Sequence, residues 1–502
     1  MKYKKLEDFI NILREKELLV EDNTYEIIKK HDVKYISYNS KNVAGDTLFV
    51  CKGRGFRTQH LIDAVNKGAF CYVSEKKREV DAPYIIVKNI RKALTEIGNL
   101  YHNQIWNINL EMVGITGTKG KTTTAIFLKS IIDDYCRENN IHDTGLITGV
   151  YTYDGKEKKK ASLTTPETFE LHQLLANCVY NDCKYLVMET SSQALKYGRS
   201  AGINYKVGLF LNLGEDHISD SEHEDMEDYF GSKLKIFKQS DIACVNLDIE
   251  EPYCDRILSE AQKYCSKIVT FSKEKKADVF GYDVVEDLER LKLKVNCYGK
   301  VYDLDVNIGG SYNVENVLSA VATATALDIP FHNIQNGLKT VKVPGRMEIY
   351  TLPNKDVKVI VDYAHNEMSY RALFESVKTT CPDKKKMFLF GCVGGRAFNR
   401  RKEGGIVANE EADKVVLTEY DYGEEDIMDI CNEIKSYISP EKDVVIIPDR
   451  EEAVRHCLDI AEDGWVVILA GYSSGDKLVR GKKHYKVPCD VDTVTNYIKT
   501  VK

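Results

Sequence analysis

Long apolar segments are missing from this sequence of 502 residues. No run approaches the roughly 18–20 apolar residues that a membrane-spanning helix needs. The N-terminal stretch MKYKKLEDFI carries charges where a signal peptide needs an apolar core. We therefore expect a cytoplasmic protein without membrane insertion.

Paired cysteines and an excess of basic residues are missing as well. The 14 cysteines are scattered, and neither a CxxC, a zinc-site spacing nor a repeat of fixed period occurs. In a reducing cytosol they are most simply free thiols, many of them buried. The 77 acidic and 70 basic residues give a net charge of -7, which argues against nucleic acid as the main partner.

The length exceeds what one hydrophobic core accommodates, so several domains are expected. Residues 1–103 mix short strand and helix patterns, whereas residues 104–342 and 343–502 each alternate strand-like with helical stretches. That alternation is typical of mainly parallel α/β sheets. The main strand-like runs lie at 110–116, 184–188, 205–213, 242–246, 357–361, 386–390, 414–417, 443–447 and 465–469. We predict an α/β fold with a small N-terminal domain, a central domain and a Rossmann-like C-terminal domain, at these boundaries.

The strongest motif is GITGTKGKTTT at residues 114–124. A strand-like run leads into a glycine-rich turn, and a helix is expected from about residue 121. Glycines allow the backbone to approach a phosphate, and a helix N-terminus attracts its charge. In such a loop Lys121 neutralises the β- and γ-phosphates of ATP, and the Thr122 hydroxyl binds Mg²⁺. The predicted nucleotide-binding residues are Gly114, Gly117, Thr118, Lys119, Gly120, Lys121, Thr122 and Thr123.

The spacing of this loop departs from the common GxxxxGK[ST] pattern, which would place a glycine at position 115, where Ile115 stands. The shifted form resembles the loops of Mur ligases, folylpolyglutamate synthases and cyanophycin synthetases. A chance glycine turn before a helix is the alternative, and the order of strand, loop and helix argues against it. The resemblance implies a central ATP-binding domain of the P-loop type.

A carboxylate follows the next strand-like run. Glu189 stands at its C-terminal end, where parallel sheets hold their ligands, and can bind a hard cation beside the phosphates. The alternative role is a helix-capping acid.

The segments NLGEDH (212–217) and YFGSK (229–233) resemble those of Mur ligases of the MurE type. In that family a lysine placed four residues after a tyrosine is carbamylated by CO₂ and helps to hold the second of two Mg²⁺ ions. The resemblance implies His217 and a carbamylated Lys233 as metal ligands, with Lys235 as the alternative because the spacing before Tyr229 departs from the family pattern. From the residues alone, His217 is more simply a hydrogen-bonding histidine.

Three further segments resemble the family's nucleotide site: GSYNVENVLSAVATA, VPGRMEIY and VIVDYAHN. The resemblance implies that Asn313 and Asn316 contact the nucleotide and that Arg346 reaches an ATP phosphate when the C-terminal domain closes. It also implies that Asp362 binds the ribose and that His365 lies near the nucleotide. Without the resemblance, the asparagines are helix caps and Asp362 only ends a strand.

The acceptor site is implied by the segments NSKNVAGDTLFV, LTTPE and SSQALKYGR. In MurE-type enzymes the first binds uridine and the others contact the muramoyl dipeptide. The residues implied here are Ser40, Thr164, Thr165, Ser191, Gln193 and Arg199. The expected partners are UDP-N-acetylmuramoyl-L-Ala-D-Glu and an amino acid, and the chain is expected to be a monomer. The implied activity is ATP-dependent amide formation through an acyl phosphate in peptidoglycan precursor synthesis.

The resemblance weakens at the amino-acid pocket. Arg396 is retained, but the DNPR segment of diaminopimelate enzymes is replaced by a stretch ending in Tyr422-Gly423, and the GKGHE segment is absent. Loss of that arginine removes a bidentate contact to a second carboxylate. The acids Asp421, Glu424 and Glu425 could attract a cationic side chain, such as that of lysine or ornithine, or form a solvated loop.

Three alternatives remain open from the sequence. The chain could be a related amide ligase with another acceptor or amino acid, acting for example on folate. It could be a catalytically inactive, nucleotide-sensing paralogue, since DNPR and GKGHE are lost. It could also be a P-loop ATPase coupled to motion.

Overall fold

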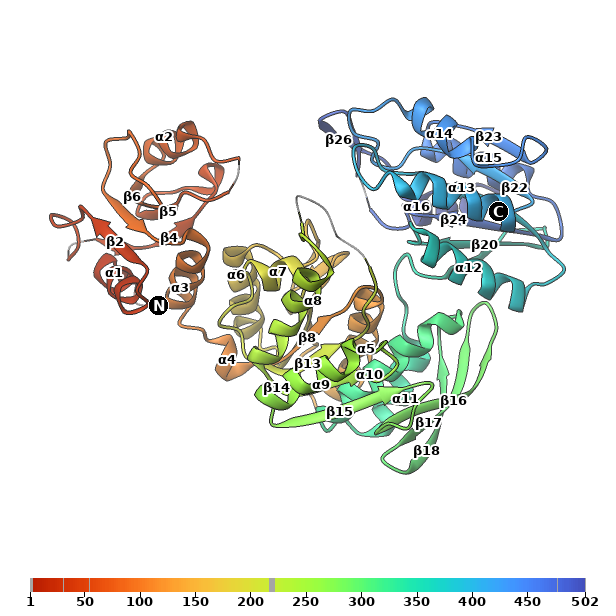
Figure 1. Ribbon diagram of the computed structural model, residues 1–502, viewed down its shortest axis with the longest axis horizontal. Helices are drawn as coiled ribbons and strands as arrows, with labels where there is room; N and C mark the ends of the chain where they lie inside the picture. Colours follow the sequence, from red (N-terminus) through yellow and green to blue (C-terminus); the bar gives the residue numbers. More distant parts are fainter. Residues whose placement is uncertain (1–2, 30, 54, 216–221, 476, 502) are drawn as a thin grey trace. The chain divides into compact units, whose positions relative to one another are not determined.

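The computed structural model describes residues 3–29, 31–53, 55–215, 222–475 and 477–501 (Figure 1). It divides into two compact units. The first comprises Met1–Ala125, Ile132–Thr270 and Ala322–Ile329, and the second comprises Ile126–Ile131, Phe271–Val321 and Pro330–Lys502.

The first unit begins with a sheet of strand order β2-β7-β6-β5-β4, in which β2 is antiparallel to its neighbour and the others are parallel. Helices α1 and α3 cover one face through residues such as Phe9 and Leu94, and α2 covers the other through Leu61 (Figure 1). The strands are β2 (Leu19–Asp22), β4 (Tyr35–Ser37), β5 (Thr47–Val50), β6 (Ala69–Ser74) and β7 (Tyr84–Val87). The helices are α1 (Leu6–Glu15), η1 (Ser40–Asn42), α2 (Thr58–Asn66) and α3 (Ile90–His102), and β1 (Lys4–Lys5) pairs with β3 (Asp32–Val33).

A second sheet follows in the same unit, with the order β11-β10-β9-β12-β8-β13-β14-β15. Strands β9, β12, β8, β13 and β14 are parallel, so the loops after β8, β12 and β13 meet at one edge. The strands are β8 (Glu111–Thr116), β9 (Gly145–Ile147), β10 (Tyr151–Tyr153), β11 (Lys158–Lys160), β12 (Tyr185–Glu189), β13 (Tyr205–Phe210), β14 (Ser240–Asn246) and β15 (Lys267–Ser272). The helices are α4 (Trp106–Asn109), α5 (Lys121–Glu138), α6 (Thr168–Tyr180), α7 (Ser192–Lys196), α8 (Met226–Leu234), η2 (Lys235–Gln239) and α9 (Tyr253–Tyr264).

The second unit contains an antiparallel meander of β16 (Val279–Glu286), β17 (Leu291–Cys297) and β18 (Lys300–Val306). Buried and exposed residues alternate along β17, as expected for a strand with one solvated face. The helices that follow are η3 (Ser311–Asn313), α10 (Val314–Ala326) and α11 (Phe331–Thr340). Sequence reasoning did not predict this meander.

The C-terminal sheet of the second unit has the order β19-β20-β24-β21-β22-β23 and is parallel except for β19. The strands are β19 (Glu348–Thr351), β20 (Val357–Asp362), β21 (Lys385–Phe390), β22 (Lys414–Leu417), β23 (Asp443–Ile446) and β24 (Trp465–Ala470). The helices are α12 (Glu367–Thr380), α13 (Asn399–Glu411), α14 (Ile427–Lys435), α15 (Arg450–Ile460) and α16 (Asp490–Val501). A hairpin of β25 (Lys477–Arg480) and β26 (Lys483–Lys486) precedes α16.

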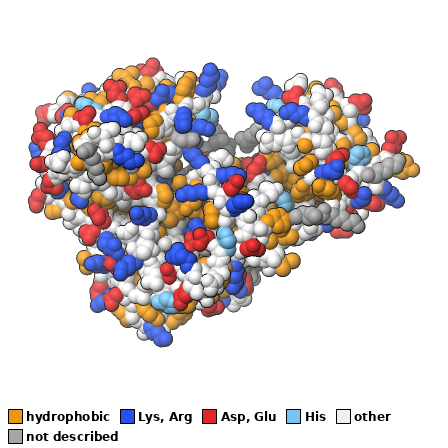
Figure 2. Space-filling view, turned by 180° about the vertical axis from the view of Figure 1, so that it is seen from behind, with side chains coloured by type: hydrophobic (Ala, Val, Ile, Leu, Met, Phe, Trp, Pro, Cys, Tyr) orange, Lys and Arg blue, Asp and Glu red, His pale blue; other side chains and the backbone are white. Residues whose placement is uncertain are grey.

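The predicted α/β fold, with a mainly parallel central sheet and separate sheets on either side in the sequence, is confirmed. The predicted domain boundaries at residues 103/104 and 342/343 stay predictions. In the described part of the chain, no helix is both long and apolar enough to cross a membrane. Acidic and basic side chains are interspersed on the face shown in Figure 2.

The cysteines are free thiols, as predicted. All are buried except Cys265 and Cys381, which are partly exposed. Each of the three large sheets carries at least one of the buried thiols, either in a strand or in a helix packed on it: Cys71, Cys244 and Cys457 are examples.

Candidate active site

The loop after β8 has the backbone that a phosphate-binding loop needs. Gly117 and Gly120 have positive φ angles of 153° and 78°. A Cβ on Gly117 would lie only 2.9 Å from the Cβ of Leu211, so a larger residue does not fit without moving the chain. Helix α5 begins directly after Gly120, and no side chain caps it. The partial positive charge of this helix start suits a phosphate.

Two side chains hold this loop in shape. The ammonium of Lys121 donates to the carbonyl oxygens of Gly117 (2.9 Å) and Thr118 (3.0 Å). After β13, the Asn212 Oδ1 accepts from the N–H groups of Thr118 and Lys119, both at 3.0 Å. The loop is therefore fixed by contacts to its own backbone, with the predicted phosphate-binding ammonium lying against it.

The structure brings two predicted magnesium ligands together. Glu189 pairs in register with Ile115, so β12 and β8 end side by side. The Thr122 hydroxyl donates to Glu189 Oε1 (2.7 Å), which also accepts from the N–H of Gly149 (3.0 Å). The Glu189 side chain is only 2% exposed, and these donors compensate for its burial.

Lys233 also lies against the phosphate loop. Its ammonium donates to the Gly117 carbonyl oxygen (2.8 Å) and lies 4.3 Å from the ring centroid of Tyr229. The side chain is 1% exposed. Lys235 is partly exposed, and burial lowers its pKa. Of the two candidate lysines, Lys233 is the one that donates a hydrogen bond to the loop, and the predicted ligand His217 lies outside the described residues.

A buried histidine that sequence reasoning missed joins the two helices of this region. His223 is fully buried; its Nδ1 lies 2.9 Å from Asp228 Oδ2 and its Nε2 lies 2.9 Å from the Ser192 hydroxyl. Lys196 binds the same carboxylate oxygen at 2.6 Å. Burial lowers the pKa of His223, and the hydrogen bond to Asp228 opposes this. The contacts hold α8, which carries Lys233, to α7, which follows Glu189.

Three of the predicted acceptor-binding residues lie together beside Glu189. The Thr165 hydroxyl donates to the Glu189 carbonyl oxygen (2.9 Å) and accepts from the N–H of Ser191 (3.0 Å). Arg199 donates to the Thr165 carbonyl oxygen (3.4 Å) and forms an ion pair with Glu167 (3.0 Å). The Arg199 Nε is buried without a hydrogen-bond partner among the described residues.

The other predicted substrate residues are less closely grouped. The Thr164 hydroxyl lies beside Gly149, since a Cβ on that glycine would be 3.3 Å away. Gln193 lies in α7 and is partly exposed. Ser40 begins η1 in the first sheet's region, and Arg396 is exposed in the loop after β21.

Two side chains of the first sheet, missed by sequence reasoning, reach the acceptor group. The Lys52 ammonium forms an ion pair with Glu167, and the Tyr38 hydroxyl hydrogen-bonds Glu170. The same ammonium lies 4.3 Å from the Tyr38 ring centroid. Burial lowers the pKa of Lys52, and its hydrogen bond to Glu167 opposes this. The pair Lys52–Glu167 spans 115 residues, so no local motif signals it.

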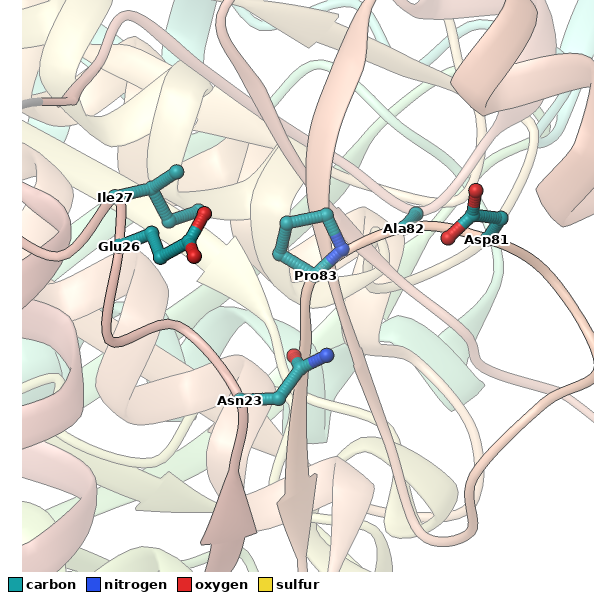
Figure 3. A pocket seen from close by; sticks show the side chains of 6 residues that line it. All are labelled: Asn23, Glu26, Ile27, Asp81, Ala82 and Pro83. Carbon is teal, nitrogen blue, oxygen red and sulfur yellow. The ribbon is translucent and has the colours of Figure 1, made fainter.

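A pocket of about 320 Å³ lies elsewhere in the first sheet's region (Figure 3). It is lined by Asn23, Glu26, Ile27, Asp81, Ala82 and Pro83. None of the predicted site residues lines it.

In the second unit, Asp362 is held at the end of β20. Its carboxylate accepts from the N–H groups of Ala364 (2.7 Å) and Met347 (2.9 Å). Burial raises the pKa of Asp362, and the Arg346 guanidinium opposes this. That guanidinium lies 4.2 Å from the ring centroid of Tyr363.

The remaining predicted nucleotide contacts lie in the same unit. His365 bonds through Nδ1 to the carbonyl oxygen of Tyr363 (2.8 Å). Asn316 donates to Asn313 Oδ1 (3.0 Å), and both asparagines are buried. Burial raises the pKa of Tyr312, and the Asp362 charge adds to this. The segment that begins α10 is therefore within electrostatic reach of Asp362.

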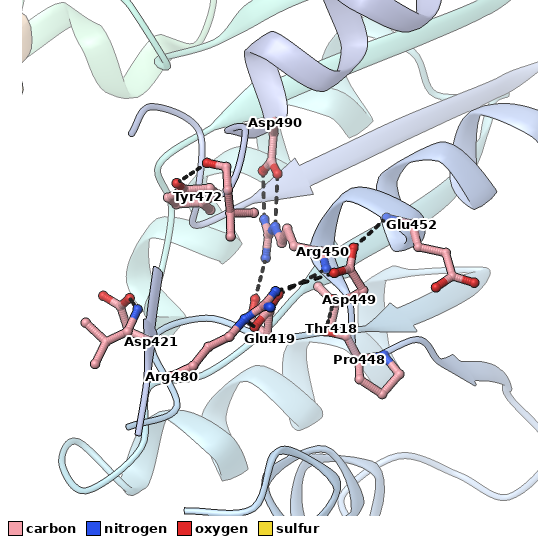
Figure 4. Close-up of polar contacts among 12 residues, drawn as sticks. Thr418, Glu419, Asp421, Pro448, Asp449, Arg450, Glu452, Tyr472, Arg480 and Asp490 are labelled. Atoms are coloured by element: carbon pink, nitrogen blue, oxygen red, sulfur yellow. Dashed lines mark hydrogen bonds and ion pairs between the residues drawn. The ribbon is translucent and has the colours of Figure 1, made fainter. Parts of the chain in front are cut away.

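Ion pairs surround the loop after β22, and two of their acids, Glu419 and Asp490, are buried (Figure 4). Glu419, 2% exposed, accepts from Arg480 Nε (2.8 Å), and the same guanidinium reaches Asp449 (3.4 Å). The fully buried Arg450 donates twice to the equally buried Asp490, at 2.9 and 2.7 Å. Both arginines therefore form ion pairs with acidic side chains of the chain itself.

The three acids of the predicted amino-acid pocket also have partners inside the chain: Asp421 with the N–H of Val479 (2.7 Å), Glu424 with Lys482 (3.2 Å) and Glu425 with Arg401 (2.6 Å). Gly423 has a positive φ of 60°, and a Cβ there would meet nothing within 4 Å. Gly423 and Arg480 form an isolated β-bridge, so the β25–β26 hairpin lies against this loop.

The donors around the phosphate loop fit a magnesium ion. Among the described residues, no group of three or more His, Cys, Asp or Glu side chains could hold a metal. A cation here would instead take the Thr122 hydroxyl and the Glu189 carboxylate, together with phosphate oxygens. Magnesium prefers such a set of few protein oxygens plus substrate phosphates.

Comparisons with known proteins agree with this geometry. The family model of the Mur ligase middle domain matches residues 115–324, and that of the Mur ligase, glutamate ligase domain matches residues 345–472. The UDP-N-acetylmuramoyl-L-alanyl-D-glutamate–L-lysine ligase of Enterococcus faecalis is 35% identical, over 88% of this chain and 87% of its own. The corresponding 2,6-diaminopimelate ligase of Clostridium perfringens is 33% identical, over 89% of this chain and 92% of its own.

Solved structures are similar in fold. A structure of UDP-N-acetylmuramoyl-L-alanyl-D-glutamate–2,6-diaminopimelate ligase superposes with a TM-score of 0.66 at 20% identity. The match covers 100% of this chain and 99% of that one.

Proposed function

The chain belongs to the Mur ligase family, whose members are ATP-dependent amide ligases, and we propose that it adds L-lysine to UDP-N-acetylmuramoyl-L-alanyl-D-glutamate in peptidoglycan precursor synthesis. The resemblance to MurE-type members is confirmed by the relatives. The observation that carries the ligase assignment is the convergence of Lys121, Thr122, Glu189 and Lys233 on one loop.

The residues of the proposed amino-acid pocket favour lysine as the substrate. Gly423 occupies the position of the arginine that binds a second carboxylate in diaminopimelate enzymes, and Arg480 beside it is held by Glu419. The lysine side chain ends in an ammonium alone, whereas the diaminopimelate side chain ends in an ammonium and a second carboxylate. Asp421, which is partly exposed in this loop, supplies a negative charge that would attract this ammonium. The name of the Enterococcus faecalis relative supports the same choice.

The chemistry assigned to the chain's own residues begins with phosphoryl transfer. Lys121 neutralises charge on the β- and γ-phosphates, while Thr165, Ser191 and Arg199 bind the acceptor so that its reacting carboxylate faces the γ-phosphorus. The carboxylate oxygen attacks, and ADP leaves to give an acyl phosphate. Catalysis of this step is mainly positioning and charge neutralisation.

Amide formation follows. The amino group of lysine attacks the acyl carbon, the nitrogen loses a proton, and inorganic phosphate leaves. Arg346 would reach the phosphates when the C-terminal sheet closes over the loop, and Asp362 and His365 would hold the ribose side of the nucleotide. Closure excludes water that would otherwise hydrolyse the acyl phosphate.

Magnesium, which Mur ligases use, neutralises the phosphate oxygens when bound. Thr122 and Glu189 would hold it. Lys233, carbamylated by CO₂, would add an anionic oxygen ligand for a second ion, together with His217. The burial of Lys233 against the Gly117 carbonyl oxygen supports its choice over Lys235.

The ligase assignment is tested by phosphate release with ATP, Mg²⁺ and UDP-N-acetylmuramoyl-L-alanyl-D-glutamate. Lysine, ornithine and diaminopimelate are compared, and each product is identified by mass. We expect turnover with lysine to dominate. Turnover with diaminopimelate instead would overturn the lysine assignment, and silence with every amine would overturn the acceptor.

The carbamate is tested separately with Lys233→Ala and the neighbouring control Lys235→Ala. In a CO₂-depleted buffer the native activity should fall and recover on adding bicarbonate, and ¹³C-bicarbonate should give a carbamate NMR signal. Lys233→Ala should lose both the signal and at least about 100-fold in kcat, a loss typical of one transition-state contact. A signal that survives in this variant and disappears in Lys235→Ala would reverse the assignment.

A further inference from the structure

Two cations from distant parts of the sequence, Lys52 after β5 and Arg199 after α7, bind one carboxylate beside the acceptor group. The Lys52 ammonium binds Glu167 Oε2, and Arg199 Nη2 binds Glu167 Oε1 at 3.0 Å. The Lys52, Arg199 and Glu167 side chains are 11%, 12% and 21% exposed. The cluster is therefore largely removed from water, where ionic contacts are strong.

The charges of this cluster do not balance inside it. Two cations contact the partly exposed Glu167 carboxylate, which leaves one positive charge in excess among these three side chains. Glu170 is the next acid, but it is exposed and hydrogen-bonded to the Tyr38 hydroxyl. Solvent therefore screens its charge more than that of Glu167. One more negative charge beside Lys52 and Arg199 would neutralise this excess.

A donor without an acceptor points to the same conclusion. The Arg199 Nε is buried and has no hydrogen-bond partner among the described residues. A buried donor left in this state costs free energy, so a ligand oxygen that accepts from it would be stabilising. Burial also lowers the pKa of Lys52, and a second anion beside it would favour its charged form.

The position of the cluster identifies the anion. Arg199 contacts Thr165, whose hydroxyl contacts the Glu189 main chain at the proposed metal site. The acceptor's D-glutamyl residue carries two carboxylates, of which one is activated and the other stays ionised through the reaction. The second carboxylate is the anion that must be held near the reacting one.

We propose that Lys52 is a further acceptor-binding residue, which with Arg199 binds the D-glutamyl carboxylate that is not activated, while Glu167 positions both cations. This rests on the proposed acceptor. It makes a side chain of the first sheet part of the specificity for the dipeptide, in addition to the uridine contact implied for Ser40.

The test compares two acceptors with two variants. One acceptor is UDP-N-acetylmuramoyl-L-alanyl-D-glutamate, and the other carries a carboxamide in place of the carboxylate that is not activated. Lys52→Met removes the ammonium. Lys34→Met is the matched control, because Lys34 pairs with Asp46 in the same sheet and is 43% exposed. The ratio of the two kcat/KM values is independent of how much of a variant folds.

We expect the native chain and Lys34→Met to prefer the carboxylate acceptor. Lys52→Met should lose about tenfold or more in kcat/KM for the carboxylate acceptor, as for a charged hydrogen bond, and stay within about twofold for the carboxamide. Equal losses for both acceptors would overturn the proposal, since Lys52 would then act only through Glu167. A native chain inactive with the carboxylate acceptor would overturn the proposed function itself.

Discussion

The loop after β8 and the loop after β22 both follow the C-terminal end of a parallel strand, but they are stabilised differently. In the first, Lys121, Lys233 and Asn212 bond to the backbone of the loop. In the second, a β-bridge between Gly423 and Arg480 is accompanied by an ion pair between the side chains of Glu419 and Arg480. Backbone contacts fix the path of the chain. Ion pairs neutralise some side-chain charges of the loop, and the charges that are not neutralised can bind a ligand.

This difference separates two kinds of specificity, the recognition of ATP and the choice of the amino acid. A loop held through its own backbone presents N–H groups and an ammonium to any phosphate, so it suits a cosubstrate that is always ATP. A loop held by ion pairs can change its net charge when one partner changes. In the proposed amino-acid pocket, the second loop would therefore be the place where the choice of amino acid can shift without a change of fold.

The largest effect should come from the first loop. Lys121→Met removes the ammonium that we propose neutralises the phosphates, and we expect about a 1000-fold fall in kcat because such a contact acts in the transition state. Phosphate release under saturating ATP measures it. Lys238→Met, an exposed lysine, serves as the control. A loss under tenfold in Lys121→Met would break the contrast between the two loops.

The buried ion pair beneath the second loop should matter for stability more than for chemistry. Arg450→Met leaves the Asp490 charge buried without its partner, and we expect a loss of about 3–5 kcal/mol in the free energy of unfolding. Arg455→Met breaks an exposed pair with Glu451 on the same helix and should cost at most about 1 kcal/mol. Urea unfolding compares the two, and equal losses would show that burial does not distinguish these pairs.

The amino-acid preference should be adjustable at one position. Gly423→Arg places a guanidinium at the position that we propose corresponds to the arginine of diaminopimelate enzymes, and a Cβ has open space there. The positive φ of 60° costs about 1 kcal/mol for a residue other than glycine. We expect the kcat/KM ratio of diaminopimelate to lysine to rise about 10- to 100-fold. An unchanged ratio would place the choice of amino acid outside this loop.

The smallest effect concerns two buried histidines outside both loops, His102 and His172. Burial lowers the pKa of His102 to about 4 and that of His172, which packs 4.8 Å from the Trp106 ring, to about 3. Both are neutral when folded, so their contribution is complete above pH 6.5, the ordinary pKa. This contribution to stability is lost as the pH falls toward the pKa values that the two histidines have in the folded state.

Between pH 6.5 and 5.5 we expect each imidazole to cost up to about 1.4 kcal/mol of stability. Urea midpoints at the two pH values measure this in the native chain and in the double variant His102→Gln/His172→Gln. The variant should show a flatter dependence on pH. An identical slope would mean that other groups govern the acid response.

Much of the fold could be predicted from apolar runs. Strands such as β22 (Lys414–Leu417) have the predicted bounds, because runs bounded by polar residues form buried parallel strands. The run predicted at 205–213 ends as strand at Phe210, since Asn212 turns to bind the phosphate loop. The meander β16–β18 and the hairpin β25–β26 were missed; β26 is exposed along its length and has no apolar pattern to detect.

The candidate site was predictable where its contacts are local. Spacing places Lys121 and Thr122 on one helix start, and strand order places Glu189 beside them. Lys52 and Glu167 come together although 115 residues separate them. The burial of His223 could not be predicted from its neighbours in the sequence. Such pairs follow only from tertiary packing.

Because each of the three large sheets carries a buried cysteine, chemical modification of that cysteine measures local unfolding of its sheet. A thiol reacts as its thiolate and only when reagent reaches it, and burial raises the pKa of both Cys71 and Cys457. Modification of these residues therefore requires local unfolding, in the manner of amide hydrogen exchange. Labelling rates read peptide by peptide would give the opening free energy of the first, central and C-terminal sheets in one experiment, without any introduced probe.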